Sequence, residues 1–251
     1  FYVVTDDYNV YKCLNNDNNT ASTVKPDHTT LATPTESDGY QWKFMYSISA
    51  SDVIKFVTND FIPVKTLGAK LAVAGGVDTG SQDGRLGDAA TDDGSAQWDV
   101  ENGAVDGALD RVRVVAGGSG YTASQTNTNI TIRGDGTGGV ATVVTNGSGV
   151  VSSVSITTAG SGYTTAFIAN EDIPGFNDAN QPADGTNDSA NIEFIIPPKN
   201  GHGADPVEEL GGNYIILNSR LEYSEGSGDF PTDNDFRQIG VVVNPTDAGG
   251  N

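Results

Sequence analysis

The chain has 251 residues, a net charge of −20 and a single cysteine, Cys13. This length can bury one large core or two medium ones. The charge repels phosphate backbones and anionic lipid, which argues against nucleic acid and membrane surfaces as partners but leaves a basic protein open. One cysteine excludes an intrachain disulfide, and no apolar run of about 18 residues could form a membrane span.

Glycine and aromatic residues are distributed unevenly along the chain. Residues 67–194 hold 22 of the 32 glycines but only 6 of the 20 aromatic residues. We therefore expect a discontinuous, aromatic-rich β domain formed by residues 1–66 plus 195–251. It is interrupted by an inserted Gly/Asp-rich β domain, residues 67–194, with two repeats at about 96–137 and 138–194.

The N-terminal segment is predicted to be mainly strand. Residues 1–5 and 10–14 are β-branched and aromatic runs around a turn, which favours a hairpin. After a loop at residues 15–37, aromatic residues alternate with other residues from Tyr40 to Ile48, the strongest strand signal in the chain. Ser51 is expected to cap a short helical turn that follows it.

The inserted segment opens with a Gly/Asp-rich tract, residues 75–94, that we interpret as exposed loop. Trp98 and Val100 are expected to contribute to the core of the insert. Residues 130–132 and 140–144, together with the strands of the repeat described next, are expected to supply the rest.

A motif occurs twice in the insert at an offset of 42 residues, as VRVVAGGSGYT from Val112 and VSITTAGSGYT from Val154. Each copy begins as a strand of period two and continues into a turn. The shared residues are turn-formers and one aromatic residue, so the duplicated feature is structural. Glycine tolerates the positive φ that tight turns need, and each tyrosine is expected to be buried with its hydroxyl on a backbone partner; stacking on carbohydrate is the alternative. The structural anchors are Gly118, Gly120, Tyr121, Gly160, Gly162 and Tyr163.

The C-terminal segment returns to strand. Residues 192–196 are expected to rejoin the outer domain. Asp205 followed by Pro206 predicts a helix start, which Gly211 ends. Runs at 214–217, 219–223 and 239–243 complete the pattern. The sequence therefore predicts an all-β, mainly antiparallel protein: a split β-sandwich-like domain, an inserted β domain with a tandem repeat, and one or two short helices.

No catalytic, cofactor-binding or metal-ligating residue is predicted. Acid pairs such as Asp92/Asp93 and Glu208/Glu209 arise by chance among 33 acidic residues. His28 and His202 each sit in a loop signal without a second ligand at zinc spacing, and we interpret each as donating to backbone.

Two further patterns resemble a calcium site and a phosphate-binding loop but do not fit either. The acid-rich runs 78–84 and 88–93 carry oxygen ligands suited to calcium but do not fit an EF-hand, so a solvated loop is favoured. The glycines of residues 134–139 precede a strand and lack a Lys-Ser/Thr ending, so they do not form a phosphate-binding loop.

Several motifs of the outer segments, in this order, resemble the baseplate wedge subunit of contractile-tailed, T-even-like bacteriophages. They are VYKCLN at 10–15, DGYQWKFMY at 38–46, FIPV at 61–64, GHGAD at 201–205, ELGG at 209–212 and DFRQIG at 235–240. The insert resembles instead the Gly-Ser-Gly-Tyr-Thr modules of phage tail and virion proteins.

The resemblance implies a β-rich domain split by a second β domain and a structural role without catalytic residues. It also implies location in the virion after assembly in the host cytoplasm, other baseplate wedge proteins as partners, and a homodimer as a further form. We expect the isolated chain to expose an apolar patch for assembly. The rival from another class is a host-glycan-binding module of a tail fibre or spike, with insert aromatics such as Trp98 stacking on sugars. A polysaccharide-degrading enzyme is the third option.

Overall fold

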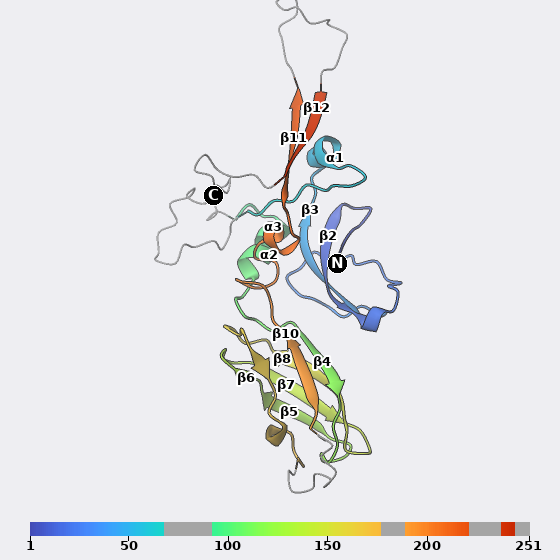
Figure 1. Cartoon of the computed structure of the whole chain (residues 1–251), viewed down its shortest axis with the longest axis vertical. Coiled ribbons are helices and arrows are strands. Elements are labelled where there is room, and N and C mark those ends of the chain that lie inside the picture. The colour runs from blue at the N-terminus through green and yellow to red at the C-terminus, as the bar shows by residue number, and fades with distance from the viewer. Residues whose placement is uncertain (68–91, 177–188, 221–236, 244–251) are drawn as a thin grey trace, which may run out of the picture.

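The computed structural model describes residues 1–67, 92–176, 189–220 and 237–243. Every strand pair in these ranges is antiparallel, and the helices are short, so the predicted all-β class is confirmed. Figure 1 shows an elongated molecule with a β body at one end and a two-stranded hairpin at the other. No helix in the described ranges has the length and apolar character needed to cross a bilayer.

The outer segments are built around a three-stranded sheet in the order β1-β2-β3. Its strands are β1 (Tyr2–Val4), β2 (Asn9–Asn16) and β3 (Tyr40–Ser47), and a 3-10 turn, η1 (Asp17–Asn19), follows β2. The N-terminal hairpin and the strand at residue 40 are therefore as predicted. β3 is buried on both faces, because even Lys43 between its aromatic residues is only 4% exposed.

Helices and loops cover the two faces of this sheet. One face carries Tyr11, Trp42 and Phe44, which pack against Val100 of helix α2 (Ala96–Gly103). The other face carries Val10, Met45, Tyr46 and Ile48, which pack against α1 (Ala50–Phe56) and Leu210, directly after α3 (Pro206–Glu209).

The caps of the helices explain where they begin. Asp205 caps α3 with Pro206 at its first position, as predicted. The expected cap of α1 is wrong by two residues: the side chain of Ser49, and not Ser51, accepts the N–H of Asp52. Ser51 lies inside the helix.

Helix α2 corrects the expected start of the insert. Trp98 and Val100 were expected in the insert core, but α2 packs on β3, and Val100 belongs to the outer core. The carboxylate of Glu101 is fully buried and accepts the N–H of Leu67 at 3.0 Å, which joins α2 to the segment after α1. Residues 96–103 therefore belong with the outer segments.

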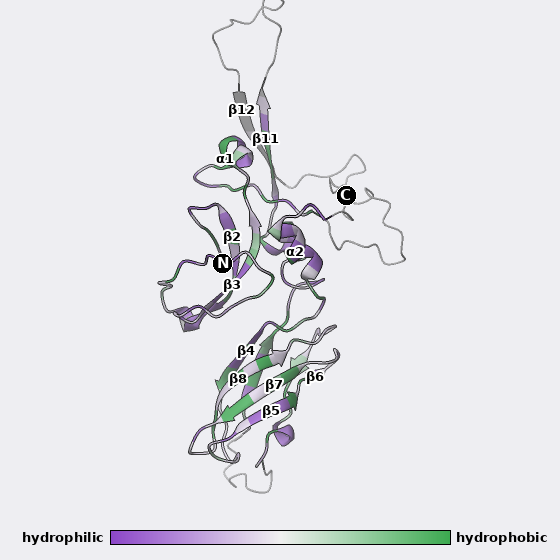
Figure 2. Ribbon diagram, turned by 180° about the vertical axis from the view of Figure 1, so that it is seen from behind, coloured by the Kyte–Doolittle hydropathy of each residue, from purple (hydrophilic) through white to green (hydrophobic). Residues whose placement is uncertain are grey.

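The second body contains two sheets around one core. One sheet has the order β5-β7-β8 and the other pairs β10 with β4; a short pair, β6 with β9, lies beside them. The strands are β4 (Arg111–Ala116), β5 (Thr126–Thr131), β6 (Arg133–Gly134), β7 (Val140–Thr145), β8 (Val151–Thr158), β9 (Ala166–Phe167) and β10 (Asn191–Ile195), with a 3-10 turn, η2 (Asn170–Asp172), after β9. Figure 2 shows strongly hydrophobic segments on strands β7 and β8 of this body.

The core of this body includes Ile130, Ile132 and Val143, as predicted. It also includes Phe194 of β10, which lies within the expected bounds of the insert, residues 67–194. The expectation that residues 192–196 rejoin the outer domain is wrong, because β10 pairs with β4 and Phe194 packs in the same core as Val112. The chain leaves the inserted body only after this strand.

The repeat anchors have the expected conformations. Gly118, Gly120, Gly160 and Gly162 all have positive φ, between 62° and 86°. Tyr163 is 2% exposed, and its hydroxyl donates to the carbonyl of Ile132 at 2.9 Å while accepting the N–H of Gly139 at 3.1 Å.

Tyr121 occupies the equivalent place in the first copy. It is 4% exposed, and its hydroxyl bonds to the side chain of Asn170 and accepts the N–H of Ala190 at 2.8 Å. Both rings are thus core residues with a satisfied hydroxyl, which leaves no ring face for a sugar.

The two copies hold each other through reciprocal backbone bonds. Leu109 N donates to Ala159 O at 3.1 Å, and the bond displaced by 42 residues, Val151 N to Gly117 O, is 2.9 Å. The strands correspond as well, because β4 pairs with β10 as β8 pairs with β7. The duplicated motif therefore forms one body with internal pseudo-symmetry.

The outermost element is the hairpin of β11 (Tyr214–Arg220) and β12 (Arg237–Val243). It extends beyond α1, away from the inserted body (Figure 1). The strands predicted at 214–217 and 239–243 are thereby confirmed. Residues 219 and 220, predicted to begin a separate strand, continue β11, and residues 221–223 lie outside the described residues.

Candidate functional site

An exposed apolar surface covers α1 and β11. Ile54 of α1 is 75% exposed, and Tyr214, Ile215 and Leu217 of β11 are between 43% and 53% exposed. We call these four residues the α1–β11 surface. Large apolar side chains exposed on two elements that contact each other are typical of a protein contact site.

The position of the α1–β11 surface is fixed by contacts between its two elements. The side-chain amide of Asn218 donates to the carbonyl of Lys55 at 2.7 Å, and the ring of Tyr214 packs edge-on against Phe61 with centroids 5.6 Å apart. Among the described residues the hairpin has no third strand, so both of its outer edges are open. Such edges are sites where another chain can pair.

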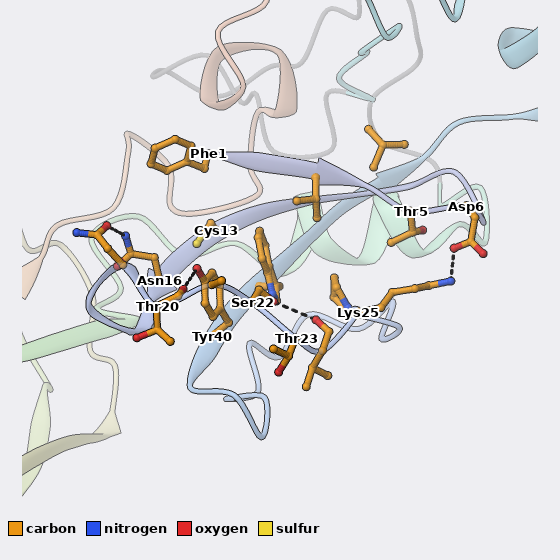
Figure 3. Close-up of a pocket in the computed structure, with 17 residues that line it drawn as sticks. Phe1, Thr5, Asp6, Cys13, Asn16, Thr20, Ser22, Thr23, Lys25 and Tyr40 are labelled. Carbon is orange, nitrogen blue, oxygen red and sulfur yellow. Dashed lines mark hydrogen bonds and ion pairs between the residues drawn. The ribbon is translucent and has the colours of Figure 1, made fainter. Parts of the chain in front are cut away.

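The second feature is a cavity of about 750 Å³ beside the three-stranded sheet, which we call the slot. One wall is formed by residues 3–6, the opposite wall by residues 19–26, and the floor by Cys13, Tyr40 and Trp42. Figure 3 shows β1 along one side, the labelled residues Thr20 to Lys25 along the other, and Phe1 at one end. Volumes between about 300 and 1,000 Å³ are usual for binding sites.

Hydrogen bonds and ion pairs hold the outer wall of the slot in place. The hydroxyl of Tyr40 donates to the carbonyl of Thr20 at 2.5 Å, and Lys25 pairs with both Asp6 and Asp7. Between these points the carboxylate of Asp38 accepts the N–H groups of Thr23 and Val24 at 2.8 and 2.9 Å. The slot is therefore preformed.

These bonds keep the carboxyl of Asp38 ionised to a lower pH than an ordinary aspartate. Burial opposes its charged form, but hydrogen bonds from Thr23, Ser22, Val24 and Tyr40 outweigh this and lower its pKa to about 2. The charged carboxylate therefore stabilises the outer wall of the slot through these hydrogen bonds.

The floor of the slot is largely apolar. Trp42 is 5% exposed, its ring stacks on Tyr40 at a centroid distance of 5.4 Å, and its indole Nε1 is buried without a hydrogen-bond partner. Burial raises the pKa of the Cys13 thiol, which disfavours the reactive thiolate.

Both histidines differ from their expected roles. Neither ring nitrogen of His28 has a hydrogen-bond partner, and its ring packs edge-on against Tyr11 at 5.6 Å. Nδ1 of His202 lies 2.6 Å from the carboxylate of Glu209, which also accepts the N–H of Gly203 at 2.8 Å. The interpretation that they donate to backbone is therefore wrong for both. His28 packs against Tyr11, and His202 joins its loop to α3.

The acidic residues considered from the sequence are not brought together. Asp92 and Asp93 each accept a backbone N–H two residues ahead, and Glu209 is occupied by its own loop. Residues 78–84 and 88–91 lie outside the described residues. Among those described, no group of three or more His, Cys, Asp and Glu side chains is placed to hold a metal ion.

Trp98, the proposed sugar-stacking residue, lies in α2 and is half-buried. Its Nε1 is buried without a partner. The ring is therefore partly covered, whereas the glycan-binding alternative requires an open aromatic platform. The glycine-rich residues 134–139 are followed by strand β7, as predicted. A phosphate-binding loop would instead lead into a helix.

Neither the slot nor the α1–β11 surface was located from the sequence. The outer wall of the slot lies in a segment that was interpreted only as loop. Its Thr, Ser and Asn residues follow no hydrophobic period that would predict a structural element. A signal for α2 was present, since Ser95 caps it and Gln97 and Glu101 are spaced to bond on one face.

Comparison with known proteins found no matching family model, no matching curated protein and no matching solved structure.

Proposed function

We propose that this chain is a non-enzymatic structural protein of a phage tail baseplate, a wedge component that links neighbouring subunits. The observation that carries the proposal is the α1–β11 surface, a set of exposed apolar side chains on α1 and on a projecting hairpin with open edges. The motifs of the outer segments add to it, because they resemble the baseplate wedge subunit. The partners are then other wedge proteins, and the location is the virion.

In this proposal the inserted body and the outer segments have different roles. The inserted body is held together by its own core and its reciprocal bonds. The outer segments carry both the apolar surface and the slot. With a net charge of −20, the chain favours partner surfaces that are basic around an apolar centre.

The first experiment asks whether the surface is needed for assembly. Ile54→Lys and Leu217→Lys, introduced together in the phage that encodes this chain, place two charges on the α1–β11 surface. We expect correctly folded protein that fails to enter tails, with infectious titre reduced at least 100-fold, because an unpaired charge is costly at the centre of an interface.

The matched control places the same charges on the inserted body. Val115 and Phe167 are 48% and 49% exposed, so Val115→Lys with Phe167→Lys changes charge and exposed area in a similar way. We expect this variant to assemble. If purified virions hold the chain only in the capsid or lack it, the proposal fails.

A further inference from the structure

A second cavity, of about 500 Å³, lies where the outer segments meet the inserted body, and we call it the junction cavity. The end of β2 contributes Asn15 and Asn16 to its lining, and β4 contributes Arg111 and Arg113. None of the described residues that line it is acidic, although the chain has 33 acidic residues against 13 basic ones. Junctions between domains are common places for ligands to bind.

The two arginines of the junction cavity face different residues on the neighbouring strand. β10 pairs with β4 so that Glu193 lies opposite Arg113 and Ile195 lies opposite Arg111. Opposite charges placed across two strands in this way attract each other, and Arg113 does form an ion pair with Glu193. Arg111 faces an apolar residue instead. In the described part of the chain no carboxylate forms an ion pair with Arg111.

The guanidinium of Arg111 therefore carries a charge that the protein compensates poorly. The side chain is half-buried, and its one hydrogen bond among the described residues goes from Nη2 to the neutral Oδ1 of Asn15 at 3.0 Å. Burial and the like charge of Arg113 lower the pKa of Arg111, and the attraction of Asp17 offsets them only in part. An arginine stays charged in spite of such a shift, so an anion placed against it would relieve both costs.

The donors in the junction cavity suit oxygen atoms that carry negative charge. A guanidinium has five N–H groups in a planar fork, which matches the paired oxygens of a carboxylate or a phosphate. The side-chain amide of Asn16 has two N–H groups, of which one bonds to Oδ1 of Asn19 at 2.6 Å. A cation would be repelled by the arginines, and an apolar ligand would cover Arg111 without pairing its charge.

We infer that the junction cavity binds a small oxyanion, with a carboxylate or phosphate group, on Arg111 and the neighbouring asparagine amide. Because β2 belongs to the outer segments and β4 to the inserted body, the bound anion ties these two parts together. The inference is independent of the proposed function, since the junction cavity and the α1–β11 surface share no residue.

Titration of the purified chain with sodium malonate and with sodium phosphate tests this inference. The buffer contains about 0.15 M NaCl, where the Debye length is about 8 Å, so most of the distant negative charge of the chain is screened. Additional NaCl at matched ionic strength is the blank. We expect at least one of the two anions to shift the Arg111 Nε–H resonance in a saturable way and to raise the unfolding temperature. The tighter of the two shows whether the site prefers a carboxylate or a phosphate.

Arg111→Gln removes the charge and should weaken binding at least about 10-fold, because a charge-assisted hydrogen bond is lost. Arg133→Gln is the matched control. Arg133 is an arginine of the same body that lies outside the junction cavity and pairs with Glu171 and Asp172, so its loss should leave the anion affinity unchanged.

Ile195→Glu gives Arg111 the carboxylate that it lacks, in the position that Glu193 has opposite Arg113. Ile195 is 41% exposed, so the strand can accept a polar side chain there. We expect this variant to lose anion binding and to unfold at a higher temperature than the chain without anion. Ile195→Gln, which has nearly the same shape without the charge, should keep the binding. This pair of variants decides the matter if Arg111→Gln does not fold.

The inference is overturned if NaCl alone shifts the Arg111 resonance as much as malonate and phosphate do. It is also overturned if the anions bind Arg111→Gln or Ile195→Glu as tightly as the parent chain, because the site would then lie elsewhere. Neither result bears on incorporation into tails, which is tested through Ile54 and Leu217.

Discussion

The backbone N–H of Tyr163 donates to the carbonyl oxygen of Gly107 at 3.3 Å, so the tyrosine of the second repeat is held by the glycine that precedes the first. The converse bond runs from Tyr121 to Gly149 at 3.2 Å. A side chain at either glycine would enter this contact.

Gly107→Ala should therefore destabilise the inserted body strongly. A methyl group at Gly107 would lie 2.1 Å from Tyr163 N, and the residue has φ of +64°. We expect a loss of about 3 kcal/mol or more in the free energy of unfolding, measured in urea. Gly120→Ala is the control: φ is +86° but nothing lies within 4 Å, so the loss should be only about 1–2 kcal/mol. Equal losses would contradict the reciprocal contact.

Tyr163→Phe should leave two buried backbone groups without their partner. The hydroxyl serves Ile132 O and Gly139 N, and both bonds are buried. We expect a loss of about 1–3 kcal/mol in thermal or chemical unfolding. Tyr2→Phe, on a side chain that is half exposed, should change stability by less than about 0.5 kcal/mol. If the two substitutions behave alike, the anchoring role of Tyr163 is wrong.

Asp38 should make the slot wall sensitive to acid. Its pKa is lowered to about 2 in the folded chain and lies near 3.9 in an unfolded one, so its contribution is present above about pH 4 and is lost as pH falls toward 2. The difference in stability between the chain and Asp38→Ala should therefore shrink over this window. Unfolding at several pH values measures it, and a difference that stays constant from pH 5 to pH 2 would contradict the assignment.

Asp205→Ala should cost more than a comparable change at an exposed cap. Asp205 is 7% exposed and accepts the N–H groups of Val207 and Glu208 and the hydroxyl of Thr66 at 2.5 Å. We expect a loss of about 2 kcal/mol, against about 0.5–1 kcal/mol for Ser49→Ala at the exposed start of α1. Calorimetry on both variants checks the order, and a reversed order would show that α3 does not depend on this cap.

Sequence patterns predicted what depends on local chemistry. The alternation of residue types identified the N-terminal hairpin and β3, and the Asp205-Pro206 pair identified α3. The duplicated glycines indicated the positive φ values that the structure has at these positions. Pairing between distant segments was not predicted. Residues 192–196 were expected to rejoin the outer domain, yet β10 pairs with β4, because the hydrogen-bond partners of a strand are not encoded by its own period.

The sites were harder still to foresee. The slot arises from tertiary contacts of a polar loop, such as the bond from Tyr40 to Thr20, that no spacing in the sequence announces. The role of His202 depends on Glu209, which a turn of helix brings back to its loop. Trp98 was expected in the core of the insert, and in the rival reading on a sugar-binding surface, because the helix that contains it was not recognised.

The exchange of bonds between the two repeats has an evolutionary consequence. Backbone groups before and within the turn of each copy are paired through the other copy, as they would be in a two-fold pair of separate molecules. One copy alone would leave these backbone groups without partners. We therefore expect recombination to add or remove the two copies only together.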